Sequence, residues 1–107
     1  MSYNVLSIQP FDKQLKRLSK KYPSLKEDFT SLVKSLKKEP KQGDLIGHNC
    51  YKIRLAIKSK GKGKSGGARI IINVVISEEN VYLLAIYDKS NNSNITDLEL
   101  KTLLKQI

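Results

Sequence analysis

The residues best suited to chemistry in this sequence are cationic, and they gather in its middle. From Leu45 to Ser77 the chain has no aspartate or glutamate, yet it carries Lys52, Arg54, Lys58, Lys60, Lys62, Lys64 and Arg69. Tyr87 and Lys89 follow at the end of a later apolar run. Cations of one sign on a shared sheet face repel one another unless they bind an anion. We therefore expect this region to bind a polyanion.

The whole chain supports the same expectation. Its 107 residues include 20 lysines and arginines against 10 acids, which gives a net charge of +10. This length predicts a single domain over residues 1–107, with a hydrophobic core of its own. So large a positive charge favours nucleic acid, an anionic membrane face or an acidic protein as partner. A membrane role is the weakest of these, because the helical segments lack a Trp- and Phe-rich apolar face.

The composition excludes several other classes of protein. One cysteine, Cys50, rules out a disulfide framework and a Cys-based zinc site, and it fits a reducing compartment. One histidine, His48, makes a His-based metal site or a two-histidine ribonuclease improbable. The sequence has no apolar run of membrane-spanning length and no signal peptide at its start. We expect a cytoplasmic protein with no metal and no cofactor.

Three features of the sequence suggest a functional site but are better explained as ordinary structural residues. Gly63-Lys64-Ser65 resembles the end of a phosphate-binding P-loop, but Lys58 stands where that motif needs its first glycine. The loop also precedes a predicted strand, whereas a P-loop precedes a helix. His48 is expected to be a loop residue, and Cys50 is expected to be a small core residue.

Apolar spacing predicts the elements that position the cations. Phe11, Leu15, Leu18 and Tyr22 form one helical stripe, and Ser24 with Glu27 has the capping-box pattern of a second helix. Thr96 with Glu99 repeats that pattern before a short final helix. We predict strands over 3–9, 51–58, 68–76 and 81–87, helices over 10–22 and 24–38, and a helix that ends the chain.

The order β-α-α-β-β-β-α predicts an α+β fold. A helical hairpin would cover one face of a small antiparallel sheet, to which the first strand adds. Alternation along 51–58 places Lys52, Arg54 and Lys58 opposite the core-facing residues of that strand. Strand pairing would bring Arg69, Tyr87 and Lys89 to the same patch.

The order and spacing of these segments resemble those of the RelE/ParE superfamily of type II toxins. The segments are GHNCYKIRL at 47–55, SGGARII at 65–71, IYDK at 86–89 and ITDLEL at 95–100. They look most like the HigB-type branch, over nearly the whole chain. Two departures stand out: the final helix has no tyrosine, and Ala68 replaces an aromatic residue common in relatives.

The resemblance implies a ribosome-dependent mRNA endonuclease that a cognate antitoxin neutralises. Such enzymes cut the codon in the ribosomal A site through attack of the ribose 2′-OH on the adjacent phosphate, without a metal. By this likeness Arg69 and Arg54 stabilise the phosphate, Lys89 is the acid, and Tyr87 orients the 2′-OH or stacks on a base. RNA backbone binding falls to Lys52, Lys58, Lys60, Lys62 and Lys64.

Two alternatives remain open at this point. A ParE-like inhibitor of DNA gyrase shares the fold and needs no RNA-cleaving residues. A nonenzymatic RNA-binding module, or an inactive toxin, would bind RNA with steep salt dependence and cut nothing.

Overall fold

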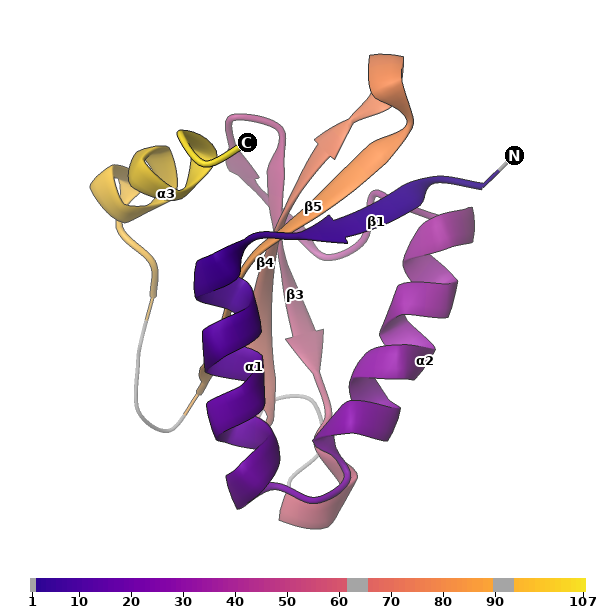
Figure 1. Cartoon of the computed structure of the whole chain (residues 1–107), viewed down its shortest axis with the longest axis vertical. Coiled ribbons are helices and arrows are strands. Elements are labelled where there is room, and N and C mark those ends of the chain that lie inside the picture. The colour runs from indigo at the N-terminus through magenta and orange to yellow at the C-terminus, as the bar shows by residue number, and fades with distance from the viewer. Residues whose placement is uncertain (1, 62–65, 90–93) are drawn as a thin grey trace.

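The computed structural model describes residues 2–61, 66–89 and 94–107 and shows an α+β fold (Figure 1). In chain order the elements are β1 (Asn4–Ser7), α1 (Gln9–Lys21), α2 (Leu25–Lys38), β2 (Asp44–Gly47), β3 (Cys50–Leu55), the 3-10 turn η1 (Lys58–Lys60), β4 (Ala68–Val75), the 3-10 turn η2 (Ile76–Glu78), β5 (Asn80–Asp88) and α3 (Asp97–Leu104). In the part of the chain that is described, no helix is long and apolar enough to cross a bilayer.

The five strands form one sheet in the order β1-β5-β4-β3-β2. The predicted antiparallel arrangement is confirmed for β3, β4 and β5, but β1 joins the edge of β5 in parallel, so the sheet is mixed. A parallel neighbour requires a crossover, and the helical hairpin α1–α2 supplies part of it. In this order β4 lies at the centre of the sheet, between β5 and β3.

The sequence did not predict β2, which pairs with β3 in a tight hairpin. The two turn residues, His48 and Asn49, both have positive φ (52° and 59°), as a type I′ turn requires. Asn73 of β4 supports this turn, because its side-chain amide donates to the carbonyl oxygens of His48 (3.0 Å) and Asn49 (3.4 Å). The turn depends on residues that are adjacent in the sequence, whereas β2 is only four residues long and has too short an alternating pattern to be recognised.

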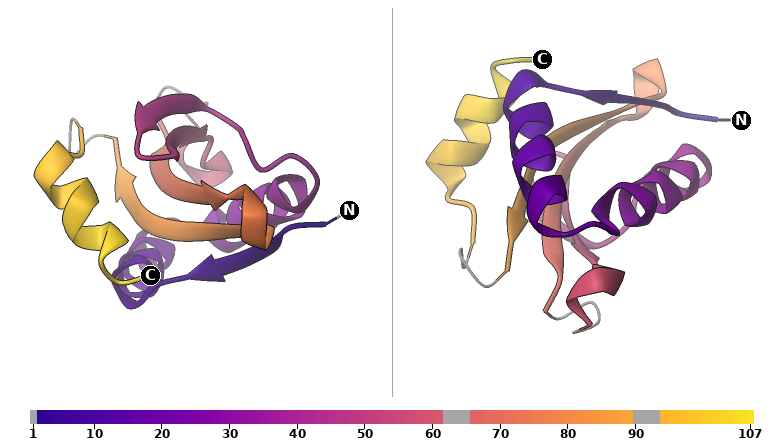
Figure 2. Two further views of the ribbon diagram at one scale, coloured as in Figure 1. Left: turned by 90° about the horizontal axis from the view of Figure 1, so that it is seen from above. Right: turned by 60° about the horizontal axis from the view of Figure 1, so that its bottom comes forward.

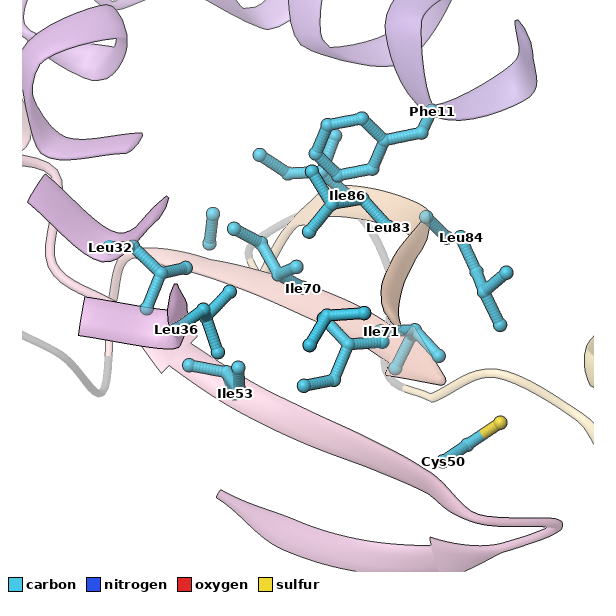
Figure 3. Packing of buried hydrophobic residues seen from close by; sticks show 14 of the residues in the cluster. Phe11, Leu32, Leu36, Cys50, Ile53, Ile70, Ile71, Leu83, Leu84 and Ile86 are labelled. Carbon is cyan, nitrogen blue, oxygen red and sulfur yellow. The ribbon is translucent and has the colours of Figure 1, made fainter. Parts of the chain in front are cut away.

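The main core lies between the sheet and the helical hairpin. Phe11, Leu32 and Leu36 face Ile70 and Ile86 of the central strands (Figure 3), and all five are buried. Burial of each such side chain stabilises the fold by about 1.5–3 kcal/mol. Leu84 of β5 and Leu100 of α3 are also buried and belong to the same hydrophobic cluster.

The helix boundaries agree with the sequence prediction, but one of the two predicted caps is wrong. The Thr96–Glu99 capping box of α3 is confirmed, with both reciprocal hydrogen bonds present. Ser24 makes no capping bond at α2; its hydroxyl instead donates to Asp28 Oδ2 at 2.8 Å. Figure 2 shows α3 on the other side of β5 from α2, so the hairpin and α3 cover different parts of the sheet.

The predicted strand over 51–58 is too long. β3 ends at Leu55, and Lys58 begins η1, where its backbone N–H donates to Asp28 Oδ2 at 3.0 Å. Lys58 therefore does not share the strand face with Lys52 and Arg54, which corrects the sequence prediction.

Candidate functional site

Three of the predicted site residues form one row across the sheet. The strand register places Arg54 of β3 directly opposite Arg69 of β4, and Arg69 directly opposite Tyr87 of β5. Directly paired residues project from the same face of a sheet. Asp88, the residue next to Tyr87, contacts the helical hairpin, so the row projects from the other face. We call Arg54, Arg69 and Tyr87 the cationic row.

The two arginines of the cationic row differ in exposure. Arg54 is exposed, whereas Arg69 is only 6% exposed and donates from Nη1 to its neighbour's carbonyl oxygen, that of Ala68, at 3.2 Å. Like charges in directly opposite positions destabilise a sheet. An anion bound between the two guanidinium groups would remove that repulsion, and arginine suits phosphate oxygens because its donors form a planar fork.

Tyr87 completes the row with a phenol in an unusual environment. Burial raises the pKa of Tyr87, the positive charge of Arg69 acts in the opposite direction, and the negative charge of Glu99 raises it slightly further. The phenol therefore stays protonated at neutral pH and can donate a hydrogen bond. Its hydroxyl oxygen is buried and has no hydrogen-bond partner within residues 2–61, 66–89 and 94–107.

Lys52 and Lys89 lie near the row. Lys52 is two residues before Arg54 on the same strand, and its ammonium donates to Asn94 Oδ1 at 3.1 Å. Lys89 directly follows β5, and its side chain is exposed. Its backbone N–H donates to the Gly67 carbonyl oxygen at 3.1 Å, which extends the β4–β5 pairing past Asp88. The structure therefore holds Lys89 close to the end of the row that contains Tyr87.

The structure does not bring every predicted cation to the row. Lys60 binds Asp88 on the opposite face, with 2.6 Å between Nζ and Oδ1, and its side chain is only 10% exposed. The hydrogen bond that the Lys60 ammonium donates to Asp88 raises the pKa of Lys60. Lys58 lies beside it in η1. Lys62 and Lys64 lie outside the described residues, so for all four lysines RNA binding stays a prediction.

His48 and Cys50 take the ordinary positions that the sequence predicts. Cys50 is fully buried, burial raises the pKa of its thiol, and Asn73 donates a hydrogen bond to its sulfur at 3.5 Å. His48 is an exposed turn residue whose Nε2 lies 3.3 Å from Asp97 Oδ1. Neither residue belongs to the cationic row.

A pocket that the sequence did not predict lies beside Tyr87. It has a volume of ≈ 450 Å³ and lies between β5, α1 and α3. Its lining is Gln14, Ala85, Tyr87, Asn94, Ile95, Leu98, Glu99, Thr102 and Leu103. The sequence identified Glu99 only as a capping residue and gave no signal for Gln14, because these residues meet only through tertiary packing.

Fold and site together define a small α+β domain with a row of two arginines and a tyrosine on the sheet face opposite its helical hairpin. Residues 11–107 match the family model of the RelE toxin of the RelE / RelB toxin-antitoxin system. The chain belongs to the RelE toxin family, a family of mRNA-cleaving type II toxins.

Solved structures share the fold at low sequence identity. A double arginine-to-alanine variant of the E. coli toxin RelE in the free state matches with a TM-score of 0.66 and 17% identity, covering 100% of this chain and 99% of that one. The intact E. coli RelBE toxin-antitoxin complex matches with a TM-score of 0.62 and 18% identity, covering 81% of this chain and 96% of that one. The RelBE2 toxin-antitoxin complex from Mycobacterium tuberculosis matches with a TM-score of 0.59 and 14% identity, covering 82% of this chain and 92% of that one.

Proposed function

We propose that this RelE-family toxin cuts mRNA in the ribosomal A site without a metal, and thereby stops translation. The observation that supports this most directly is the cationic row, in which Arg54, Arg69 and Tyr87 are register partners on three adjacent strands. RNA cleavage by its own 2′-OH needs stabilisation of charge at phosphorus and a proton for the leaving oxygen. These side chains and Lys89 provide both.

In the proposed reaction the ribose 2′-oxygen loses its proton and forms a bond to phosphorus. The bond between phosphorus and the 5′-oxygen breaks, which leaves a 2′,3′-cyclic phosphate on one product. Arg69 and Arg54 donate to the phosphate oxygens as their charge increases, and Lys89 protonates the departing 5′-oxygen. The Tyr87 phenol donates to the reacting ribose or phosphate, because its raised pKa keeps the proton in place.

A cognate antitoxin is the proposed protein partner. The similar E. coli and M. tuberculosis structures contain a toxin with its antitoxin. An acidic or extended antitoxin segment across the cationic row would cancel its charge and block access to RNA. The ribosome and mRNA are the other proposed partners, and they place the toxin in the cytoplasm.

The test is to induce the protein in a bacterial host and to map new mRNA 5′ ends. We expect ends inside translated codons that disappear when translation is blocked. Arg69→Ala should reduce cleavage by about tenfold or more, which corresponds to about 1.4 kcal/mol of transition-state stabilisation. Tyr87→Phe and Lys89→Ala should each have an effect of similar size.

Lys34→Ala is the control, because Lys34 is an exposed cation of α2, on the helical hairpin and outside the row. It should cleave at the wild-type rate. Full cleavage by all three site variants would remove this site from the mechanism. Growth arrest with DNA breaks and intact mRNA would instead indicate a gyrase inhibitor, and the absence of both would indicate a binding module or an inactive toxin.

A further inference from the structure

We propose that the pocket between β5 and α3 binds one unstacked base of the RNA, and that it selects a base with an exocyclic amino group over uracil. This inference rests on the proposed function, since it assigns the pocket to the same substrate. Tyr87 belongs both to the cationic row and to the pocket lining. A nucleotide whose phosphate lies on the row therefore has its base within reach of the pocket.

The size and walls of the pocket suit a base. Its ≈ 450 Å³ falls within the range of about 300–1,000 Å³ typical of small-ligand sites. Ala85, Ile95, Leu98 and Leu103 supply apolar surface, and Tyr87 supplies an aromatic ring. Proteins that read single-stranded RNA hold splayed bases against aromatic and apolar side chains in this way.

Polar side chains that line the pocket have donor and acceptor atoms available for a further hydrogen bond. Gln14 accepts the backbone N–H of Ile86 with Oε1 at 3.1 Å, which leaves its amide nitrogen as a donor. Glu99 accepts the backbone N–H of Thr96 with Oε1 at 3.0 Å, which leaves Oε2 as an acceptor. The buried Tyr87 hydroxyl has no partner in the described part of the chain. Gln14 and Glu99 therefore offer one donor and one acceptor to a bound base.

The carboxylate of Glu99 carries the selectivity. Adenine, cytosine and guanine each present an exocyclic amino group that donates to a carboxylate oxygen, whereas uracil offers only its ring N3–H, which lies between two carbonyl oxygens that the negative charge repels. The lowered pKa of Glu99 keeps this carboxylate charged, because the Thr96 backbone and hydroxyl groups hydrogen-bond with it. A good base contact of this kind discriminates by about tenfold or more.

Glu99→Gln tests this contact without disturbing α3. Glutamine also completes a capping box, so its carbonyl oxygen keeps the bond to Thr96 while its nitrogen becomes a donor toward the pocket. Purified protein would be assayed on ribosomes programmed with mRNAs that vary each base of the A-site codon. At one codon position we expect the wild type to disfavour uracil by about tenfold or more. Glu99→Gln should remove most of that preference and keep the wild-type melting temperature.

A second variant tests the space itself. Thr102→Trp places a large ring in the pocket from an exposed position on α3, and it should lower kcat/KM by about tenfold or more. Lys105→Trp adds the same ring to an exposed position just past α3 and outside the pocket lining, so it should change kcat/KM by less than about twofold. Equal kcat/KM for Thr102→Trp and wild type, with uracil discrimination unchanged in Glu99→Gln, would overturn the proposal while cleavage itself stands.

Binding can be measured without cleavage. Backbone amide NMR spectra would be recorded during titration with cytidine 3′-monophosphate and uridine 3′-monophosphate. We expect cytidine to bind more tightly, with shifts centred on Ala85, Tyr87 and α3, and Glu99→Gln to equalise the two. If the protein cuts no RNA, the proposed function fails, and this titration still decides whether the pocket binds a base. Shifts confined to the row, or equal binding of both nucleotides by the wild type, would contradict the proposal.

Discussion

Two neighbouring rows of residues on the same three strands show opposite ways of using charge. The cationic row faces away from the helical hairpin and sets Arg54 directly against Arg69. The adjacent row, one position away on each strand, consists of Leu55, Ala68 and Asp88 and faces the hairpin. On that side Asp88 is 2% exposed and accepts hydrogen bonds from Tyr22 (2.5 Å) and Lys60 (2.6 Å).

The comparison distinguishes the charge of Asp88, which contributes to folding, from the charges of the cationic row, which we propose for binding. Asp88 joins the end of β5 to α1 and η1, and its charge is compensated within the molecule. The cationic row instead sets Arg54 and Arg69 in directly opposite positions, where two like charges repel each other. The same strands thus fix the fold through one face and present the cationic row on the other.

The largest expected effect is on the compensated face. Asp88→Ala removes the acceptor of Lys60 and Tyr22 and leaves a buried ammonium unpaired, so unfolding free energy should fall by about 3–5 kcal/mol. Urea denaturation would measure this loss. Lys60→Met combined with Asp88→Ala should recover part of it, because no uncompensated charge then remains. A loss below about 1 kcal/mol for Asp88→Ala would remove the distinction between the faces.

Alkaline pH should weaken both faces for different reasons. The pKa of Lys60 is raised by its carboxylate partner, and the pKa of Tyr87 is raised by burial. A group whose pKa is higher in the folded state gives its full stability below its unfolded pKa, and that stability is lost as pH rises through the folded value. Stability should therefore fall above about pH 10, the range where both groups titrate when unfolded.

Variants separate the two contributions to the alkaline loss. Lys60→Met should remove the part from the ion pair, and Tyr87→Phe should remove the part from the buried phenol. Thermal denaturation across pH 8–11 would measure each slope. If both variants keep the wild-type slope, the alkaline loss comes from other groups and the comparison loses this support.

The smallest expected effect is a gain in stability on the cationic row. Arg54→Leu removes one of two facing positive charges, so unfolding free energy should rise by about 0.2–1 kcal/mol while cleavage falls. The gain should shrink at high salt, because salt screens the repulsion at this exposed position. Arg17→Leu on α1 is the control and should show no such salt-dependent gain. A destabilised Arg54→Leu protein would indicate that Arg54 contributes to packing.

Much of this fold follows from sequence periodicity. The alternation of Ile53 with Lys52 and Arg54 predicts the two faces of β3, and Thr96 with Glu99 predicts the start of α3. These features depend on residues close together in the chain. The parallel pairing of β1 with β5 was not predicted, because strand direction across a long crossover depends on tertiary packing.

The site was predicted less completely than the fold. Arg54, Arg69 and Tyr87 were selected as site residues, and the register brings them into one row. Lys60 also looked like a surface cation, because the sequence could not show that Asp88, 28 positions away, binds it. Gln14 and Glu99 come together with Tyr87 only in the folded chain, so no local pattern identifies their pocket.

The parallel pairing of β1 with β5 has a consequence for synthesis. Asn4 is the register partner of Asn80, 76 positions later in the chain. A chain made from its N-terminus must therefore produce both long helices and three further strands before β1 can join the sheet. The cationic row has the same timing, because Tyr87 lies near the end of β5. A growing chain consequently cannot complete the cationic row until nearly all of β5 has been made.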